Sequence, residues 1–232
     1  MLKLDSPPKV ITFDCYGTLV QWHQAVKEAA KAILTKHASG DDLENRSATL
    51  ADQVRSRAML HQDRSPFQGY KAILQLSLDE VLAEAGFQGT EDDYQTLLSI
   101  LRRIEPHPEV PAALERLRER YKLAIISNTD SDLIAETVQA IGVPIDFVIT
   151  AQQAQAYKPD HRLFQHAYDA MAVSKDETVH VGMGQVTDMK VCHELGIRWV
   201  WIDRVGEPLD PRWQPHAVLN DLTDLPQLLS VP

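Results

Sequence analysis

The stretch Val10-Ile-Thr-Phe-Asp-Cys-Tyr-Gly-Thr-Leu19 decides the fold, because an apolar, β-prone run ends abruptly in Asp14. Gly17 follows in a turn, where the absence of a side chain lets backbone amides approach a ligand. Open α/β sheets bind their ligands at the carboxyl ends of strands, and a carboxylate held there can act as a nucleophile. Aspartate also caps turns and helices often, so this decapeptide alone leaves both interpretations open.

The rest of the chain alternates between strand-like and helical patterns. We expect strands at 10–13, 123–127, 147–150, 178–182 and 199–202, and a short edge strand at 217–219. Amphipathic helices are expected at 132–141, 161–171 and 187–195, with a last helical turn at 225–229. This alternation predicts a parallel sheet with helices on both faces.

A long gap separates the first strand from the second. Residues 22–104 show no convincing strand, but apolar residues recur with helical spacing over 22–35, 43–59, 67–85 and 91–104. An insertion of this length cannot lie inside the sheet, so we expect a helical cap domain at 22–104 and a core domain built from 1–21 and 105–232. The segment Glu105-Pro-His-Pro-Glu-Val-Pro111 is the expected return linker, since proline marks the boundaries of elements.

Composition limits the partners and the compartment. The 232 residues carry a net charge of −10, which argues against nucleic acid or an anionic membrane surface as the main partner. Cys15 and Cys192 lie far apart in the sequence and predict no disulfide framework. No signal peptide and no apolar run long enough to cross a bilayer is evident. We therefore expect a soluble, reduced, cytoplasmic protein.

Polar residues follow four of the expected elements in order: Asp14-Cys-Tyr-Gly-Thr18, Ser127-Asn128, Lys158-Pro159 and Gly182-Met-Gly-Gln-Val-Thr-Asp188. In a parallel sheet all four converge on one edge. Taken singly, Ser127-Asn128 and Asp188 are as well explained as helix caps or helix-end charges. Taken together with Lys158, they favour a catalytic site.

These four motifs resemble those of the haloacid dehalogenase superfamily, and the resemblance covers nearly the whole chain. It implies an α/β fold, a Rossmann-like parallel-sheet core with a helical cap inserted after the first strand. Phosphatases of this superfamily carry two further acids, at positions where this chain has Tyr16 and Met183. A thioether is a poor ligand for a hard cation such as Mg²⁺. We therefore expect no metal site and no cofactor, and phosphate ester hydrolysis is disfavoured.

Asp-x-Tyr-Gly-Thr-Leu resembles the L-2-haloacid dehalogenase (type II) branch. That resemblance implies attack by Asp14 on the carbon that bears the leaving group, followed by hydrolysis of the aspartyl ester. Halide leaves without a proton, and a carboxylate substrate brings its own charge, so neither a general acid nor Mg²⁺ is needed. The expected enzyme is a metal-independent hydrolase, a (S)-2-haloacid dehalogenase acting on a small 2-substituted carboxylic acid.

The resemblance also implies roles for the remaining site residues. Lys158 is expected to lie beside Asp14 and keep it ionised, and Asp188 to pair with Lys158 or position the hydrolytic water. The donors to Asp14 and the substrate are then Thr18, Ser127 and Asn128. The expected substrate-binding residues are Tyr16, Trp22, Arg55 and Arg57. For the two arginines, which are candidates for holding the leaving group, a solvated helix face is the alternative.

Three alternatives stay open. Residues 182–188 lack the Ser and Asn of the dehalogenase branch, so a related azetidine-2-carboxylate hydrolase, which opens a strained ring, is the first. The second is an atypical phosphatase that holds Mg²⁺ with Asp14 and Asp188 alone. The third is a binding module that keeps the fold as a scaffold. A homodimer is left open, and no membrane or nucleic acid is expected as a partner.

Overall fold

The computed structural model describes residues 7–37 and 42–230, and its centre is a six-stranded sheet in which every pair of neighbours is parallel. The strand order is β3-β2-β1-β4-β5-β6. The strands are β1 (Val10–Phe13), β2 (Lys122–Ser127), β3 (Phe147–Thr150), β4 (Thr178–Gly182), β5 (Trp199–Ile202) and β6 (Ala217–Leu219). Five of the six strand predictions match residue for residue, and β2 begins one residue earlier than expected.

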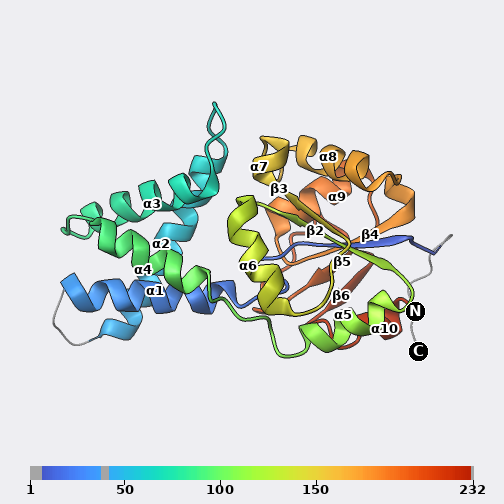
Figure 1. Cartoon of the computed structure of the whole chain (residues 1–232), viewed down its shortest axis with the longest axis horizontal. Helices are drawn as coiled ribbons and strands as arrows, with labels where there is room; N and C mark the ends of the chain where they lie inside the picture. Colours follow the sequence, from blue (N-terminus) through green and yellow to red (C-terminus); the bar gives the residue numbers. More distant parts are fainter. Residues whose placement is uncertain (1–6, 38–41, 231–232) are drawn as a thin grey trace.

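Helices cover both faces of the sheet, with α8 and α9 on one face and α5 and α10 on the other (Figure 1). The four residues of β1 are fully buried, as expected for a central strand that is covered on both sides. The core helices are α5 (Val110–Arg118), α6 (Ser131–Ile141), α7 (Ala151–Ala154), α8 (His161–Met171), α9 (Lys190–Leu195) and α10 (Leu225–Leu228), with a short 3₁₀ turn η1 (Lys175–Glu177). The predicted α/β fold class is confirmed.

Two helical regions of the core differ from the expectation. The segment after 105 was expected to be a linker through Pro111, but α5 begins at Val110 with Pro111 in its first turn. Proline is tolerated there because the first helical N–H groups have no partner within the helix. The single helix expected at 187–195 is instead a π-helical turn, η2 (Gln185–Met189), that continues into α9.

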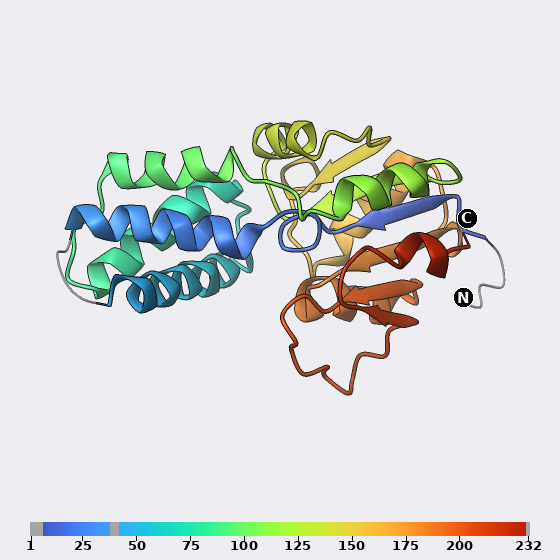
Figure 2. The ribbon, with the colours of Figure 1, turned by 90° about the horizontal axis from the view of Figure 1, so that it is seen from below.

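Four helices of the insertion form a bundle beside the core (Figure 2). They are α1 (Trp22–His37), α2 (Leu43–Gln62), α3 (Tyr70–Glu84) and α4 (Glu91–Leu101). Helix α1 packs on both α2 and α4, and α2 packs on α3. Among residues 7–37 and 42–230, no helix combines the length and apolarity needed to cross a membrane.

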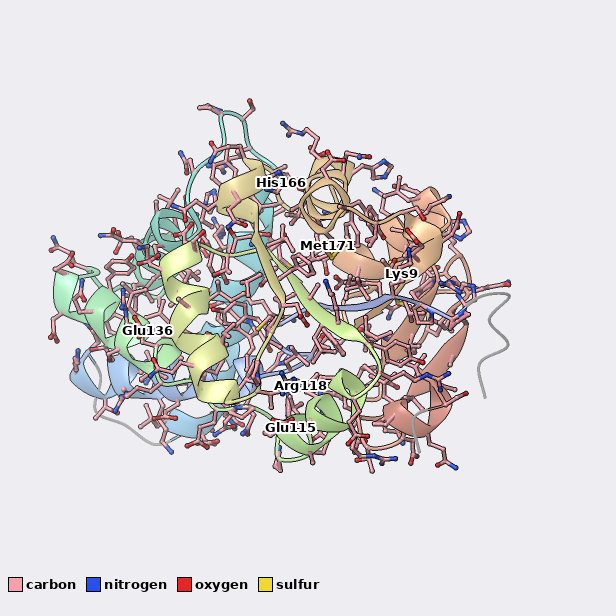
Figure 3. The ribbon with its side chains drawn as sticks, turned by 45° about the vertical axis from the view of Figure 1, so that its right-hand side comes forward. Lys9, Glu115, Arg118, Glu136, His166 and Met171 are labelled. Carbon is pink, nitrogen blue, oxygen red and sulfur yellow. The ribbon has the colours of Figure 1, made fainter. Side chains whose placement is uncertain are left out.

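The bundle is fastened to the core at the carboxyl ends of the strands. The buried Asp130 carboxylate, which follows β2, accepts hydrogen bonds from the Tyr70 and Lys71 amides at 2.9 Å each and so caps α3. Glu136 on α6, labelled in Figure 3, forms an ion pair with Arg102 just after α4. These contacts hold the four helices over the sheet edge where the polar motifs converge.

Candidate active site

Lys158 is the centre of a buried ionic cluster at this edge. Its side chain is 1% exposed, and Nζ donates to Asp14 Oδ1 at 2.8 Å, to Asp188 Oδ1 at 2.7 Å and to the Ile126 carbonyl at 2.9 Å. An ammonium group has three protons, so each one has an acceptor. Burial alone would lower the pKa of Lys158, but the two carboxylates reverse this and raise it above the ordinary value. Lys158 is therefore a permanent cation that joins the ends of β1 and β4.

The Asp14 carboxylate is fixed on both oxygens. Oδ1 accepts from Lys158, and Oδ2 accepts from the Thr18 hydroxyl at 2.7 Å. That hydroxyl accepts in turn from the backbone amide of Met183 at 3.0 Å, which links the turn after β1 to the loop after β4. Burial first, and the Asp188 charge next, raise the pKa of Asp14, while Lys158 opposes them. Of the two carboxylates in the cluster, Asp14 is the one that lines a cavity, so its side chain can contact a bound molecule.

Asp188 lies behind Asp14 and is tied down from three sides. Its Oδ1 accepts from Lys158 and lies 3.1 Å from His180 Nε2, and its Oδ2 accepts from the Thr187 hydroxyl at 2.9 Å. Burial would raise the pKa of Asp188, but Lys158 and His180 outweigh it and hold that pKa far below its usual range. Asp188 is thus an ionised counter-charge to Lys158.

A cavity of about 250 Å³ opens in front of Asp14. Its aromatic wall is made by Tyr16, Trp22 and Tyr70, with Tyr16 and Trp22 in edge contact at 5.4 Å between ring centroids. The Ser127 hydroxyl lines the same cavity and, although buried, has no hydrogen-bond partner among the described residues. A buried hydroxyl without a partner is costly unless a ligand or water satisfies it. The cavity therefore suits a small molecule with an acceptor group at Ser127.

The predicted site residues fall into three groups. The cavity is lined by Asp14, Tyr16, Trp22, Arg55, Ser127, Asn128 and Lys158. Thr18 and Asp188 contact this lining from behind. Arg57 does not line the cavity, because its guanidinium binds Glu80 at 3.3 Å and Glu84 at 2.5 Å on α3. Of the two arginines expected to bind substrate, the structure therefore brings Arg55 to the cavity and places Arg57 against α3.

Asn128 serves a different purpose from the one expected. Its Oδ1 accepts from the Lys158 amide at 2.7 Å, and its Nδ2 donates to the Lys158 carbonyl at 3.0 Å and to Gln62 Oε1 at 3.0 Å. Asn128 holds the backbone of Lys158 and links it to α2, and no hydrogen bond from its side chain reaches Asp14. The cap alternative for this pair is not seen either, since Asp130 occupies the N-cap position of α6.

Several residues at the site were not among the predictions. His23, Gln62, Met183 and Glu207 line the cavity, and His180 contacts Asp188. A usable signal for His180 was an ionisable residue between Val179 and Val181 in an otherwise apolar strand. Glu207 comes from the irregular segment after β5, where no periodic pattern indicates which side chains turn inward.

The donor set does not fit a magnesium ion of the phosphatase kind. The Asp188 oxygens are engaged by Lys158, His180 and Thr187, and no group of three or more His, Cys, Asp or Glu among the described residues is arranged to hold a metal. At the position of the missing acid, the Met183 sulfur packs on Gly17, so closely that a Cβ at Gly17 would come within 2.5 Å of it. Mg²⁺ requires oxygen ligands in an octahedral arrangement, and the Met183 thioether cannot supply one.

Comparison with known proteins agrees with this architecture. Residues 8–196 match the family of haloacid dehalogenase-like hydrolases, so the chain belongs to that family and is a hydrolase. It is 28% identical to (S)-2-haloacid dehalogenase 4A from Burkholderia cepacia, over 96% of this chain and 95% of that protein. It is 33% identical to a phosphoserine phosphatase from Thermus thermophilus, but only over 53% of this chain and 51% of that protein. The crystal structure of an L-2-haloacid dehalogenase, 25% identical, superposes with a TM-score of 0.83 over 97% of this chain and 100% of that one.

Proposed function

We propose that this protein is a metal-independent (S)-2-haloacid dehalogenase with Asp14 as nucleophile. The observation that carries the proposal is the pair of carboxylates, Asp14 and Asp188, that share one buried ammonium group while only Asp14 lines the cavity. With Tyr16 and Met183 in place of the two further acids of phosphatases, the site lacks their carboxyl proton donor for an alkoxide and one of their carboxylate ligands for Mg²⁺. The full-length similarity to dehalogenases supports the same reaction.

In the first step, an Asp14 oxygen attacks C2 of the substrate. The new carbon–oxygen bond forms as the carbon–halogen bond breaks, and halide leaves with the bonding electrons and with inversion at C2. The Ser127 hydroxyl, which has no hydrogen-bond partner within residues 7–37 and 42–230, donates to the substrate carboxylate. Arg55, which lines the cavity from α2, supplies the positive charge for the departing halide. Tyr16 remains a neutral phenol, since burial raises its pKa.

In the second step, water adds to the side-chain carbonyl carbon of Asp14. The ester bond between Cγ and the alkyl oxygen breaks, a 2-hydroxy acid is released and the Asp14 carboxylate is restored. Both protons of the water leave its oxygen: one goes to the departing alkoxide, which becomes the hydroxyl of the product, and the other goes to ionised Asp188 and then to solvent. The Thr187 hydroxyl, which lines the cavity and donates to Asp188 Oδ2, links the water to that carboxylate. Lys158 stays charged in both steps and stabilises the negative charge that develops on Asp14.

A second candidate reaction is the opening of azetidine-2-carboxylate, and one observation favours it. Glu207 lines the cavity together with Arg55, so the cavity presents an anion as well as a cation. A carboxylate there complements the ring ammonium of a cyclic amino acid. Attack by Asp14 would break the carbon–nitrogen bond, and the amine would leave as part of the same molecule.

Chloride release from L-2-chloropropionate in the presence of EDTA tests the proposal. We expect release by the natural protein and none by Asp14→Asn, which keeps the size of the side chain but lacks a nucleophilic carboxylate. Parallel assays contain azetidine-2-carboxylate and p-nitrophenyl phosphate with Mg²⁺. Ring opening without chloride release would replace the halide reaction with the second candidate, and Mg²⁺-dependent phosphate release alone would overturn both.

A further inference from the structure

His180 is a buried histidine that touches the ionic cluster but not the cavity. It lies in the middle of β4, is 1% exposed, and its ring spans the gap between β1 and Asp188. Nδ1 lies 2.8 Å from the Thr12 hydroxyl, and Nε2 lies 3.1 Å from Asp188 Oδ1. Phe164 of α8 closes one side of the ring with an edge contact at 5.1 Å between centroids. Both ring nitrogens therefore have a partner.

These partners define which nitrogen carries the proton. Asp188 is ionised, so its oxygen can only accept, and Nε2 must be the N–H donor. Nδ1 faces the Thr12 hydroxyl at 2.8 Å, and that hydroxyl also lies 3.5 Å from the Val179 carbonyl. The contacts with Thr12 and Asp188 together fix the ring plane and direct the Nε2 proton at the Asp188 carboxylate.

The His180 donor determines how firmly the Asp188 carboxylate is held. Its Oδ1 receives the Lys158 and His180 donors together, and its Oδ2 receives only the Thr187 hydroxyl from the neighbouring residue. Without the Nε2 donor, the Lys158 ammonium would be the one remaining donor to Oδ1 among the described residues. The carboxylate could then rotate about its χ angles, and Lys158 would move with it relative to Asp14.

We propose that His180 is a positioning residue for the hydrolytic step, which holds Asp188 in the orientation that binds Lys158 and takes the proton of the attacking water. This inference rests on the proposed function and adds to it a residue that never touches substrate. The geometry that this role requires is local: the Nε2 donor on β4 and the Thr12 hydroxyl that orients the ring from β1.

Two substitutions at His180 distinguish its hydrogen bond to Asp188 from the volume that its side chain fills in the core. His180→Gln places an amide donor near the Nε2 position, whereas His180→Leu fills a similar volume without a donor. We expect His180→Leu to lower kcat for L-2-chloropropionate about tenfold or more with little change in KM, because a charge-assisted hydrogen bond is lost. His180→Gln should recover most of that loss. The matched control is His61→Leu, at a histidine of similar burial that binds Glu80 in the cap.

The pH profile gives a second readout. Asp188 is faced by Asp14 from β1, Lys158 from the segment before α8, His180 from β4 and Cys192 from α9. Removing a donor from the ionised form raises the pKa of a carboxylate. In His180→Leu the acid limb of kcat should therefore move to higher pH, while the His61→Leu limb should stay in place.

Nitrogen-15 NMR of the ligand-free protein tests the geometry apart from catalysis. The His180 signals, assigned by their loss in His180→Leu, should show a proton fixed on Nε2. Thr12→Val, an isosteric change that removes the orienting hydroxyl, should weaken that preference. Equal kcat and pH profiles in His180→Leu and the natural protein, equal losses in His180→Gln and His180→Leu, or a proton on Nδ1 would each overturn the inference. A natural protein that releases no chloride but keeps the Nε2 proton would instead refute the proposed function alone.

Discussion

Lys158 compensates two buried carboxylates with one positive charge, so the cluster depends on a single side chain. Replacing it by methionine leaves Asp14 and Asp188 facing each other without a cation. Removing one partner of a buried ion pair costs about 3–5 kcal/mol, and we expect Lys158→Met to lower the free energy of unfolding by that amount and to abolish turnover. Urea unfolding measures the first effect. The control is Lys71→Met, which removes a half-exposed pair with Asp132 and should cost at most about 1 kcal/mol.

Arg55 and Arg57 make a matched pair on α2. Positions two apart on a helix point in nearly opposite directions, and only Arg55 lines the cavity while Arg57 binds α3. We expect Arg55→Ala to lower kcat/KM about tenfold or more, because the leaving halide loses a charged partner. Arg57→Ala should leave kcat/KM within about twofold and affect stability only. Equal kinetic effects of the two substitutions would contradict the assigned site.

The dependence of turnover on pH follows from the cluster. Burial raises the pKa of Asp14, and only its ionised form is a nucleophile. As the pH falls from neutrality, activity should therefore be lost at a pH above that at which an ordinary aspartate becomes protonated. Lys158, whose pKa is raised by its two carboxylates, should remain charged on the alkaline side. We therefore expect kcat/KM to rise to a plateau that extends to about pH 9. A fall in kcat/KM between neutrality and that pH would show that another group controls the reaction.

Helix α3 of the bundle depends on the core for its N-terminal cap. Its N-terminal amides, Tyr70 and Lys71, are capped by Asp130 from the core. Asp130→Ala should lower the free energy of unfolding by about 1–2 kcal/mol and speed hydrogen exchange at the start of α3. Glu115→Ala, which removes an exposed ion pair with Arg118 within α5, is the control and should leave that exchange unchanged.

Most elements could be predicted because their patterns are local. The strands are short apolar runs bounded by polar residues, and the ends of β1, β2 and β4 carry the motifs that the parallel sheet brings together. Helix α5 was missed because Pro111 indicates a boundary as readily as a first helical turn. The π-helical turn η2 was missed because its five residues, Gln185–Met189, are too few to show a period of their own. Such details depend on packing that only the folded chain defines.

On the scale of the whole molecule, the site belongs to both the bundle and the core. The bundle contributes Trp22, Arg55 and Tyr70 to the cavity, and the core contributes Asp14 and Lys158. The sequence could indicate the core half, since motifs at strand ends converge by topology. It could not indicate which face of α2 turns toward Asp14, because that follows from how the bundle is fastened to the strand ends.

The measurement that tests the central claim most directly is one turnover of L-2-chloropropionate in water enriched in heavy oxygen, with enzyme in excess. Mass spectrometry of the product and of the peptide that contains Asp14 then traces the oxygen. An aspartyl ester hydrolysed at Cγ predicts an unlabelled product and a heavy oxygen in the Asp14 carboxylate. A labelled product with an unlabelled Asp14 peptide would mean that water attacks the substrate directly, and would contradict Asp14 as nucleophile.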